Sequence, residues 1–131
     1  MDEELFQDIF DVLQDVLPDK WSKLVFYAAY FEGSYSMKYY IDNGTGQYQD
    51  CFSLFSRKDL IKKFMELDKI IIASRKKLSD KDMWTCLTMI VEENGDFCTK
   101  FDYNTIVDPI KYEQIWKKKV LGKAYEESVR W

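Results

Sequence analysis

The sequence contains no histidine. Histidine is the commonest general base near neutral pH and a frequent zinc ligand, so its absence excludes the usual Ser–His and Cys–His catalytic arrangements and most zinc sites. Gly-rich phosphate loops and nucleophile elbows are also missing. The three cysteines, Cys51, Cys86 and Cys98, lack metal-ligand spacing and fall within strand-like segments, which predicts reduced and buried thiols. We therefore expect no enzyme activity, no metal and no cofactor.

The sequence also lacks a long hydrophobic run. No apolar stretch approaches the roughly 20 residues needed to cross a bilayer. The first four residues are Met1-Asp2-Glu3-Glu4, acidic where a signal peptide would be basic. These features predict a cytoplasmic protein without a membrane partner. The net charge of −4 argues against direct nucleic-acid binding and favours a basic protein as the partner.

Apolar residues are abundant. The chain has 131 residues, of which 47% are hydrophobic and 17% aromatic. This length and composition predict one domain, residues 1–131, with a sizeable core.

The first segment has the apolar spacing of an amphipathic helix, which we expect to run from Asp2 to Leu17. Its opposite face carries Glu4, Asp8, Asp11 and Asp15, spaced four, three and four residues apart in one acidic line. This line is either a solvated face or a contact surface for a cationic partner.

A three-stranded antiparallel meander is predicted next, over residues 21–31, 34–41 and 47–55. With Glu32-Gly33 as the first loop, Phe26 faces Tyr39. With residues 43–46 as the second loop, Tyr48 faces Ile41 and Phe52 faces Met37. Both turns place the same apolar residues on one face of the sheet.

The other face of this meander is amphipathic and rich in tyrosine, a residue favoured at interfaces. It is either covered by a helix or loop, or available to a partner. In the second case its candidate contact residues are Tyr27, Lys38, Tyr40 and Gln49.

Asp50 breaks the strand pattern, because alternation would point its carboxylate into the apolar face. Three explanations are open: a bulge that turns it outward, an exposed position near the sheet edge, or a hydrogen bond from a tyrosine such as Tyr39. An exposed Asp50 joins the candidate contact residues.

A hairpin is predicted between Met83 and Tyr103, with a type I′ turn at Asn94-Gly95. This turn pairs Ile90 with Thr99 and Thr88 with Phe101. One face then carries the aromatic residues, and the other carries aliphatic residues with two charges. The first face holds Trp84, Cys86, Ile90, Phe97, Phe101 and Tyr103, and the second holds Leu87, Met89, Val91, Lys100 and Asp102.

Two more helices are expected. Ser56 begins a capping-box pattern ahead of an apolar helix, and Asp108-Pro109 form a good N-cap and first-turn pair. The predicted fold class is therefore α+β, in the order α-β-β-β-α-β-β-α, with an antiparallel sheet of about five strands and helices packed on it.

Several short pieces of the sequence, in this order, resemble those of a known protein family. The pieces concerned are Leu17-Pro18-Asp19-Lys20-Trp21, Phe26-Tyr27-Ala28-Ala29-Tyr30, Trp84-Thr85, Gly95-Asp96-Phe97 leading to Phe101-Asp102-Tyr103, and Tyr112-Glu113-Gln114-Ile115-Trp116 followed by Leu121-Gly122. In order and spacing the chain resembles the YezG-like family of immunity proteins, antitoxins encoded beside secreted polymorphic toxins. The resemblance implies a non-enzymatic inhibitor that binds a cognate toxin domain, often a nuclease, in the cytoplasm. We expect a one-to-one complex that blocks the toxin's basic active site.

Two other functions remain open from the residues alone. One is a non-catalytic scaffold or adaptor domain. The other is a small enzyme that uses carboxylates and tyrosines, with Asp50, Tyr39 and Asp102 as its candidates.

Overall fold

A computed structural model describes residues 3–122 of the chain. The predicted helix start at Asp2 and the far C-terminal residues 123–131 lie outside this range. The elements in order are α1 (Glu3–Leu13), β1 (Lys23–Phe31), β2 (Ser34–Asp42), β3 (Tyr48–Asp50), α2 (Arg57–Arg75), β4 (Cys86–Glu92), β5 (Phe97–Asp102) and α3 (Pro109–Val120). Short 3-10 turns occur at Gln14–Val16, Cys51–Ser53 and Asp80–Asp82.

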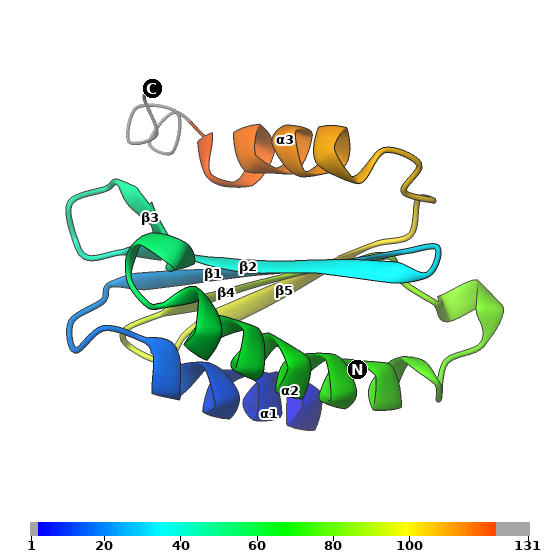
Figure 1. Cartoon of the computed structure of the whole chain (residues 1–131), viewed down its shortest axis with the longest axis horizontal. Helices are drawn as coiled ribbons and strands as arrows, with labels where there is room; N and C mark the ends of the chain where they lie inside the picture. The colour runs from blue at the N-terminus through cyan, green and yellow to red at the C-terminus, as the bar shows by residue number, and fades with distance from the viewer. Residues whose placement is uncertain (1–2, 123–131) are drawn as a thin grey trace.

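The strands form one antiparallel sheet in the order β3-β2-β1-β4-β5. Helices α1 and α2 lie on one face of the sheet and α3 lies on the other (Figure 1). The predicted α+β class, five-stranded sheet and element order are confirmed. The central strand β1 pairs with both β2 and β4, so it is buried along nearly its whole length.

Local capping signals explain where two of the helices begin. The Ser56 hydroxyl accepts a hydrogen bond from the Asp59 amide at 3.2 Å, and the Asp108 carboxylate accepts one from the Lys111 amide at 3.1 Å. The first helix ends earlier than expected, at Leu13, and a 3-10 turn continues it to Val16. Its predicted buried face is present throughout.

The larger core lies between the sheet and the helices α1 and α2. It contains buried apolar side chains from both helices and from the sheet, among them Ile9, Leu13, Phe26, Leu67 and Met89. A second and smaller core lies under α3, where Trp116 packs on Tyr27 and Tyr40 with ring centroids 4.5 and 5.9 Å away. The sheet is therefore covered on both faces.

The register of β4 and β5 differs from our prediction by one residue. Val91 pairs with Phe97 and Ile90 pairs with Cys98, rather than with Thr99. The turn contains three residues, 93–95, in which only Gly95 has a positive φ, +94°. This geometry is a three-residue turn closed by glycine, not the expected type I′ turn.

The shift moves the side chains of β5 to the opposite face relative to those of β4. Leu87, Met89 and Val91 lie in the larger core together with Phe101, whereas Cys86 lies in the smaller core under α3. The aromatic residues of β5 and the aliphatic residues of β4 therefore share one face, toward α1 and α2. The turn type decides the register, and a one-residue error in a strand reverses its side chains.

The third strand was also predicted wrongly. Tyr48 pairs with Asp42, not with Ile41, and β3 ends at Asp50. The Asp42 carboxylate accepts hydrogen bonds from the amides of Gly44 and Gly46 at 2.8 and 3.1 Å, which stabilises a loop longer than the four residues expected. The predicted pairing of Phe52 with Met37 is absent because the chain turns into a 3-10 helix at Cys51–Ser53.

Candidate functional site

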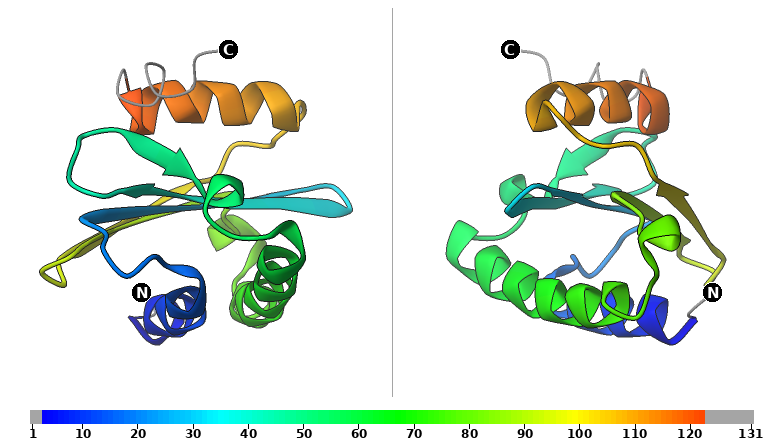
Figure 2. Two further views of the ribbon diagram at one scale, coloured as in Figure 1. Left: turned by 60° about the vertical axis from the view of Figure 1, so that its left-hand side comes forward. Right: turned by 90° about the vertical axis from the view of Figure 1, so that its right-hand side faces the viewer.

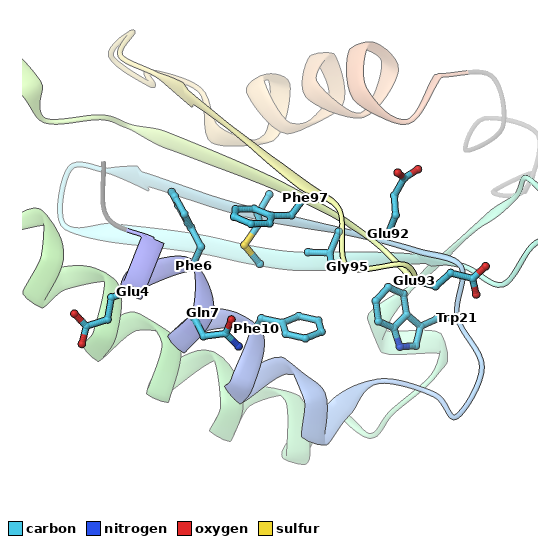
Figure 3. A pocket seen from close by; sticks show the side chains of 11 residues that line it. Glu4, Phe6, Gln7, Phe10, Trp21, Glu92, Glu93, Gly95 and Phe97 are labelled. Carbon is cyan, nitrogen blue, oxygen red and sulfur yellow. The ribbon is translucent and has the colours of Figure 1, made fainter.

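A groove lies between α1 and the hairpin formed by β4 and β5 (Figure 3). Its volume is about 550 Å³. One wall comes from the first helix and the segment before β1, and the other comes from the hairpin. The lining residues are Glu4, Phe6, Gln7, Phe10, Trp21, Met89, Val91, Glu92, Glu93, Gly95 and Phe97.

Aromatic rings form most of the apolar surface of this groove. Phe6 is buried and contacts Phe97 across the groove, with ring centroids 6.2 Å apart, while Phe10 meets Trp21 edge to face at the same separation. Phe97 itself is 52% exposed. A large apolar ring held against a fixed partner and open to solvent is a suitable anchor for a protein interface.

The positions of these rings follow from local structure. Phe6 and Phe10 are four residues apart on α1 and therefore lie on one side of the helix. Phe97 is the first residue of β5, directly after the turn that Gly95 closes. The amide of Glu93 donates a 3.0 Å hydrogen bond to the carbonyl of Ser22, which holds the hairpin turn beside Trp21. The two walls are thus fixed relative to each other.

The rim of the groove is acidic. Glu4, Glu92 and Glu93 are exposed, and within residues 3–122 none of the three carboxylates forms an ion pair. Asp8 and Asp11 follow on the outer face of α1, where Gln7 donates a 2.8 Å hydrogen bond to Asp11. An apolar centre with a carboxylate rim is complementary to a cationic protein surface that carries an apolar side chain.

Comparison with known proteins also supports a protein-binding role for this chain. The chain matches the YezG-like family of immunity proteins over residues 3–130. It belongs to this family. It is also similar to the immunity protein YezG of Bacillus subtilis (strain 168). The two sequences are 26% identical over an alignment 137 residues long, which covers 95% of this chain and 91% of the relative.

Membership of this family supports a role in immunity, and such proteins act by binding a cognate toxin. The groove lies at the surface of the protein, where a partner of this kind can reach it. No helix among residues 3–122 is both long enough and apolar enough to cross a bilayer. In the same range, no cluster of three or more His, Cys, Asp or Glu side chains is arranged to hold a metal ion.

The acidic line predicted on the first helix is present and exposed, next to the groove. Asp8 and Asp11 are directed to solvent, as is Glu4. Asp15 differs because Lys63 of α2 donates a 2.8 Å hydrogen bond to its carboxylate. Lys63 therefore partly neutralises the last carboxylate of the acidic line, which contains no lysine of its own.

The tyrosine-rich face is covered, so the candidate contact residues Tyr27 and Tyr40 are not accessible to a partner. Tyr27 and Tyr40 are 1% and 0% exposed because Trp116 of α3 covers them. Burial raises the pKa of the Tyr27 hydroxyl. Lys38 pairs with Glu113 of α3 at 3.5 Å. The open alternative of a covering helix is the one observed.

The last two predicted contact residues lie at the opposite edge of the sheet from the groove. Gln49 is exposed on β3, and Asp50 ends that strand, half-buried, with its carboxylate accepting a 2.9 Å hydrogen bond from the Phe52 amide. Of the explanations offered for Asp50, the position at the sheet edge is correct. The Tyr39 hydroxyl instead donates to the carbonyl of Val16.

The candidate enzyme residues do not converge. Asp50 is on the edge strand β3, whereas Asp102 is on the other edge strand, β5, and accepts a hydrogen bond from the Tyr112 hydroxyl at 3.3 Å. Tyr39 is fully buried on β2, a strand that lies between these two edge strands in the sheet. No common pocket therefore contains the three groups.

Sequence reasoning missed the groove. No role was predicted from the sequence for Phe6, Phe10, Glu92 or Glu93, which line the groove. The hairpin face that carries Phe97 was assigned to the wrong partners, which hid its proximity to Phe6. One signal was available: the apolar stripe of α1 carries two phenylalanines one helical turn apart, Phe6 and Phe10.

Proposed function

We propose that this family member neutralises a secreted nuclease toxin by forming a one-to-one complex in the cytoplasm, with the acidic groove seated on the toxin's basic active-site surface. The observation that carries the proposal is the exposed ring of Phe97 beside carboxylates that form no ion pair within residues 3–122. A nuclease needs a cationic cleft to hold its substrate, so an acidic inhibitor is attracted to that cleft and can occlude it.

Two kinds of contact contribute differently to such a complex. Aromatic anchors in a desolvated centre typically account for about 2 kcal/mol or more each, whereas charges at the rim mainly change the association rate. Phe97 takes the first role, since it is the most exposed aromatic ring of the groove. Glu92 and Glu93 take the second.

The proposal is tested with the toxin domain encoded beside this gene. Phe97→Ala should weaken binding about 30-fold or more, mainly through faster dissociation. Phe52→Ala is a matched control, because Phe52 is also an exposed phenylalanine, 38% accessible, but lies beside α2 outside the groove. Surface-immobilised binding measures both rates.

A titration of nuclease activity supplies the second readout. A stoichiometric inhibitor abolishes DNA or RNA cleavage at one molar equivalent, whereas a catalytic antagonist acts below it. Equal binding by Phe97→Ala and the unmodified protein would place the contact elsewhere. A partner toxin that cleaves no nucleic acid would refute the nuclease assignment and leave the binding role intact.

A further inference from the structure

Strand β5 forms one edge of the sheet (Figure 2). The groove runs beside this strand. It pairs with β4 over six residues in unbroken register. The opposite edge strand, β3, has only three residues. Proteins usually protect long edges with proline, a bulge or a covering segment. Between Phe97 and Asp102 there is no proline or bulge, and no other strand in the described chain pairs with this edge.

The direction of the backbone groups on β5 follows from one hydrogen bond. The Glu92 amide donates to the Asp96 carbonyl at 2.8 Å, so this opposed pair is a hydrogen-bonded one. Such pairs alternate along an antiparallel ladder, and the pairs of Cys98 and Lys100 with β4 are therefore hydrogen-bonded as well. The N–H and C=O groups of the intervening residues, Phe97, Thr99 and Phe101, point away from the sheet.

The side chains of these same residues belong to the groove face. Phe97 and Phe101 both contact Phe6 of α1, with ring centroids 6.2 and 6.1 Å away. Any strand added to β5 would therefore direct every second side chain over this aromatic surface. Glu92 and Glu93 lie at the turn end of the edge.

We infer that the toxin is bound by β-strand addition: an extended, cationic segment of the toxin pairs with the free edge of β5 and places an apolar side chain in the groove. Main-chain hydrogen bonds supply affinity in this mode, and pockets for alternate side chains supply specificity. The charge complement is lysine or arginine on the segment opposite Glu92 and Glu93. This inference rests on the proposed function and specifies the form of the bound toxin segment.

Hydrogen exchange of single amides tests the inference directly. In the free protein the amides of Thr99 and Phe101 should exchange fast, whereas those of Cys98 and Lys100 should be slow. In the complex with a catalytically inactive form of the neighbouring toxin domain, Thr99 and Phe101 should slow by about tenfold or more. The residues Cys98 and Lys100 are internal controls on the same strand.

A variant pair adds a second measurement. Thr99→Pro removes an outward N–H, which an edge strand tolerates, and should weaken toxin binding about tenfold. Thr99→Val keeps the N–H and changes only the side chain, so it is the reference against which the loss of binding by Thr99→Pro is measured. A complex that leaves the outward amides fast, or Thr99→Pro binding as well as Thr99→Val, would refute strand addition and leave the immunity role standing. Absence of any complex would refute both.

Discussion

The indole nitrogen of Trp116 donates a 2.8 Å hydrogen bond to the hydroxyl of Thr88 in the interior of the protein. The bond joins α3 to β4, two elements 28 residues apart at this contact. Thr88 is the buried polar side chain of the described core, 4% exposed, and Trp116 is 5% exposed. This pair fixes the helix that covers Tyr27 and Tyr40.

The hydrogen bond between Trp116 and Thr88 predicts that the effects of changing both residues on the free energy of unfolding do not add. Thr88→Val leaves the buried indole N–H without a partner and should lower the free energy of unfolding by about 1–3 kcal/mol. Trp116→Phe should also destabilise the protein, through the lost hydrogen bond and lost ring contacts. Together the two changes should cost less than their sum, because no polar group is then left unpaired. Urea unfolding of the three variants measures this, and strict additivity would show that the bond contributes nothing.

The hairpin turn predicts a second result. Gly95 has a φ of +94°, which a β-branched residue adopts only with strain. Gly95→Val should lower the free energy of unfolding by about 1–3 kcal/mol even though the space around Gly95 is open. Glu93→Val is the control, since Glu93 lies in the same turn at a negative φ. Thermal melts in which both variants match the parent would contradict the turn geometry.

The acidic face of α1 predicts an effect on association rather than dissociation. Asp8→Asn combined with Asp11→Asn should slow toxin association several-fold at low salt and flatten its salt dependence. Asp80→Asn with Asp82→Asn removes the same charge in the 3-10 turn that precedes β4, at the end of β4 far from the hairpin turn, and should have a smaller effect. Stopped-flow association across salt concentrations compares the pairs. Identical rates would mean that the α1 carboxylates only face solvent.

Buried thiols and tyrosine hydroxyls predict a loss of stability at alkaline pH. Burial raises the pKa of the Cys51 and Cys86 thiols to about 12 and also raises the pKa of the Tyr27, Tyr30 and Tyr39 hydroxyls. The unfolded chain therefore loses these protons first. Stability is fully present below about pH 9, the ordinary thiol value, and falls as the pH rises toward the folded-state values.

Denaturant unfolding from pH 8 upward measures this slope, with about 1.4 kcal/mol per pH unit for each group that titrates only in the unfolded state. Tyrosinate absorbance gives a parallel readout. The buried tyrosines should ionise together with the loss of structure, after the exposed ones. A fully folded protein in which all nine tyrosines have ionised at their ordinary pH would refute the prediction.

Several parts of the fold were readable from local patterns. The Ser56 and Asp108 caps predicted two helix starts, and the short Glu32-Gly33 turn predicted the pairing of Phe26 with Tyr39. These features depend on residues close together in sequence, where a side chain's preference is expressed directly. The five-stranded antiparallel sheet follows from the same signals.

The site was much less predictable. A three-residue turn and a type I′ turn both accept Asn94-Gly95, yet they place Phe97 and Phe101 on opposite faces. Which face α3 covers depends on distant contacts such as Trp116 with Tyr27, which no local pattern contains. Tyrosine on a sheet face is equally suited to an interface and to a core under a tryptophan.

The groove joins parts of the chain that are made at very different times during translation. Trp21 and Phe97 line it together, yet 75 residues separate them between positions 21 and 97. A ribosome must therefore complete β5 and release it from the exit tunnel before the nascent protein has this surface. A message truncated between α2 and β4 would yield a product without the groove. Under the proposed function, that product would not protect a cell that makes the toxin.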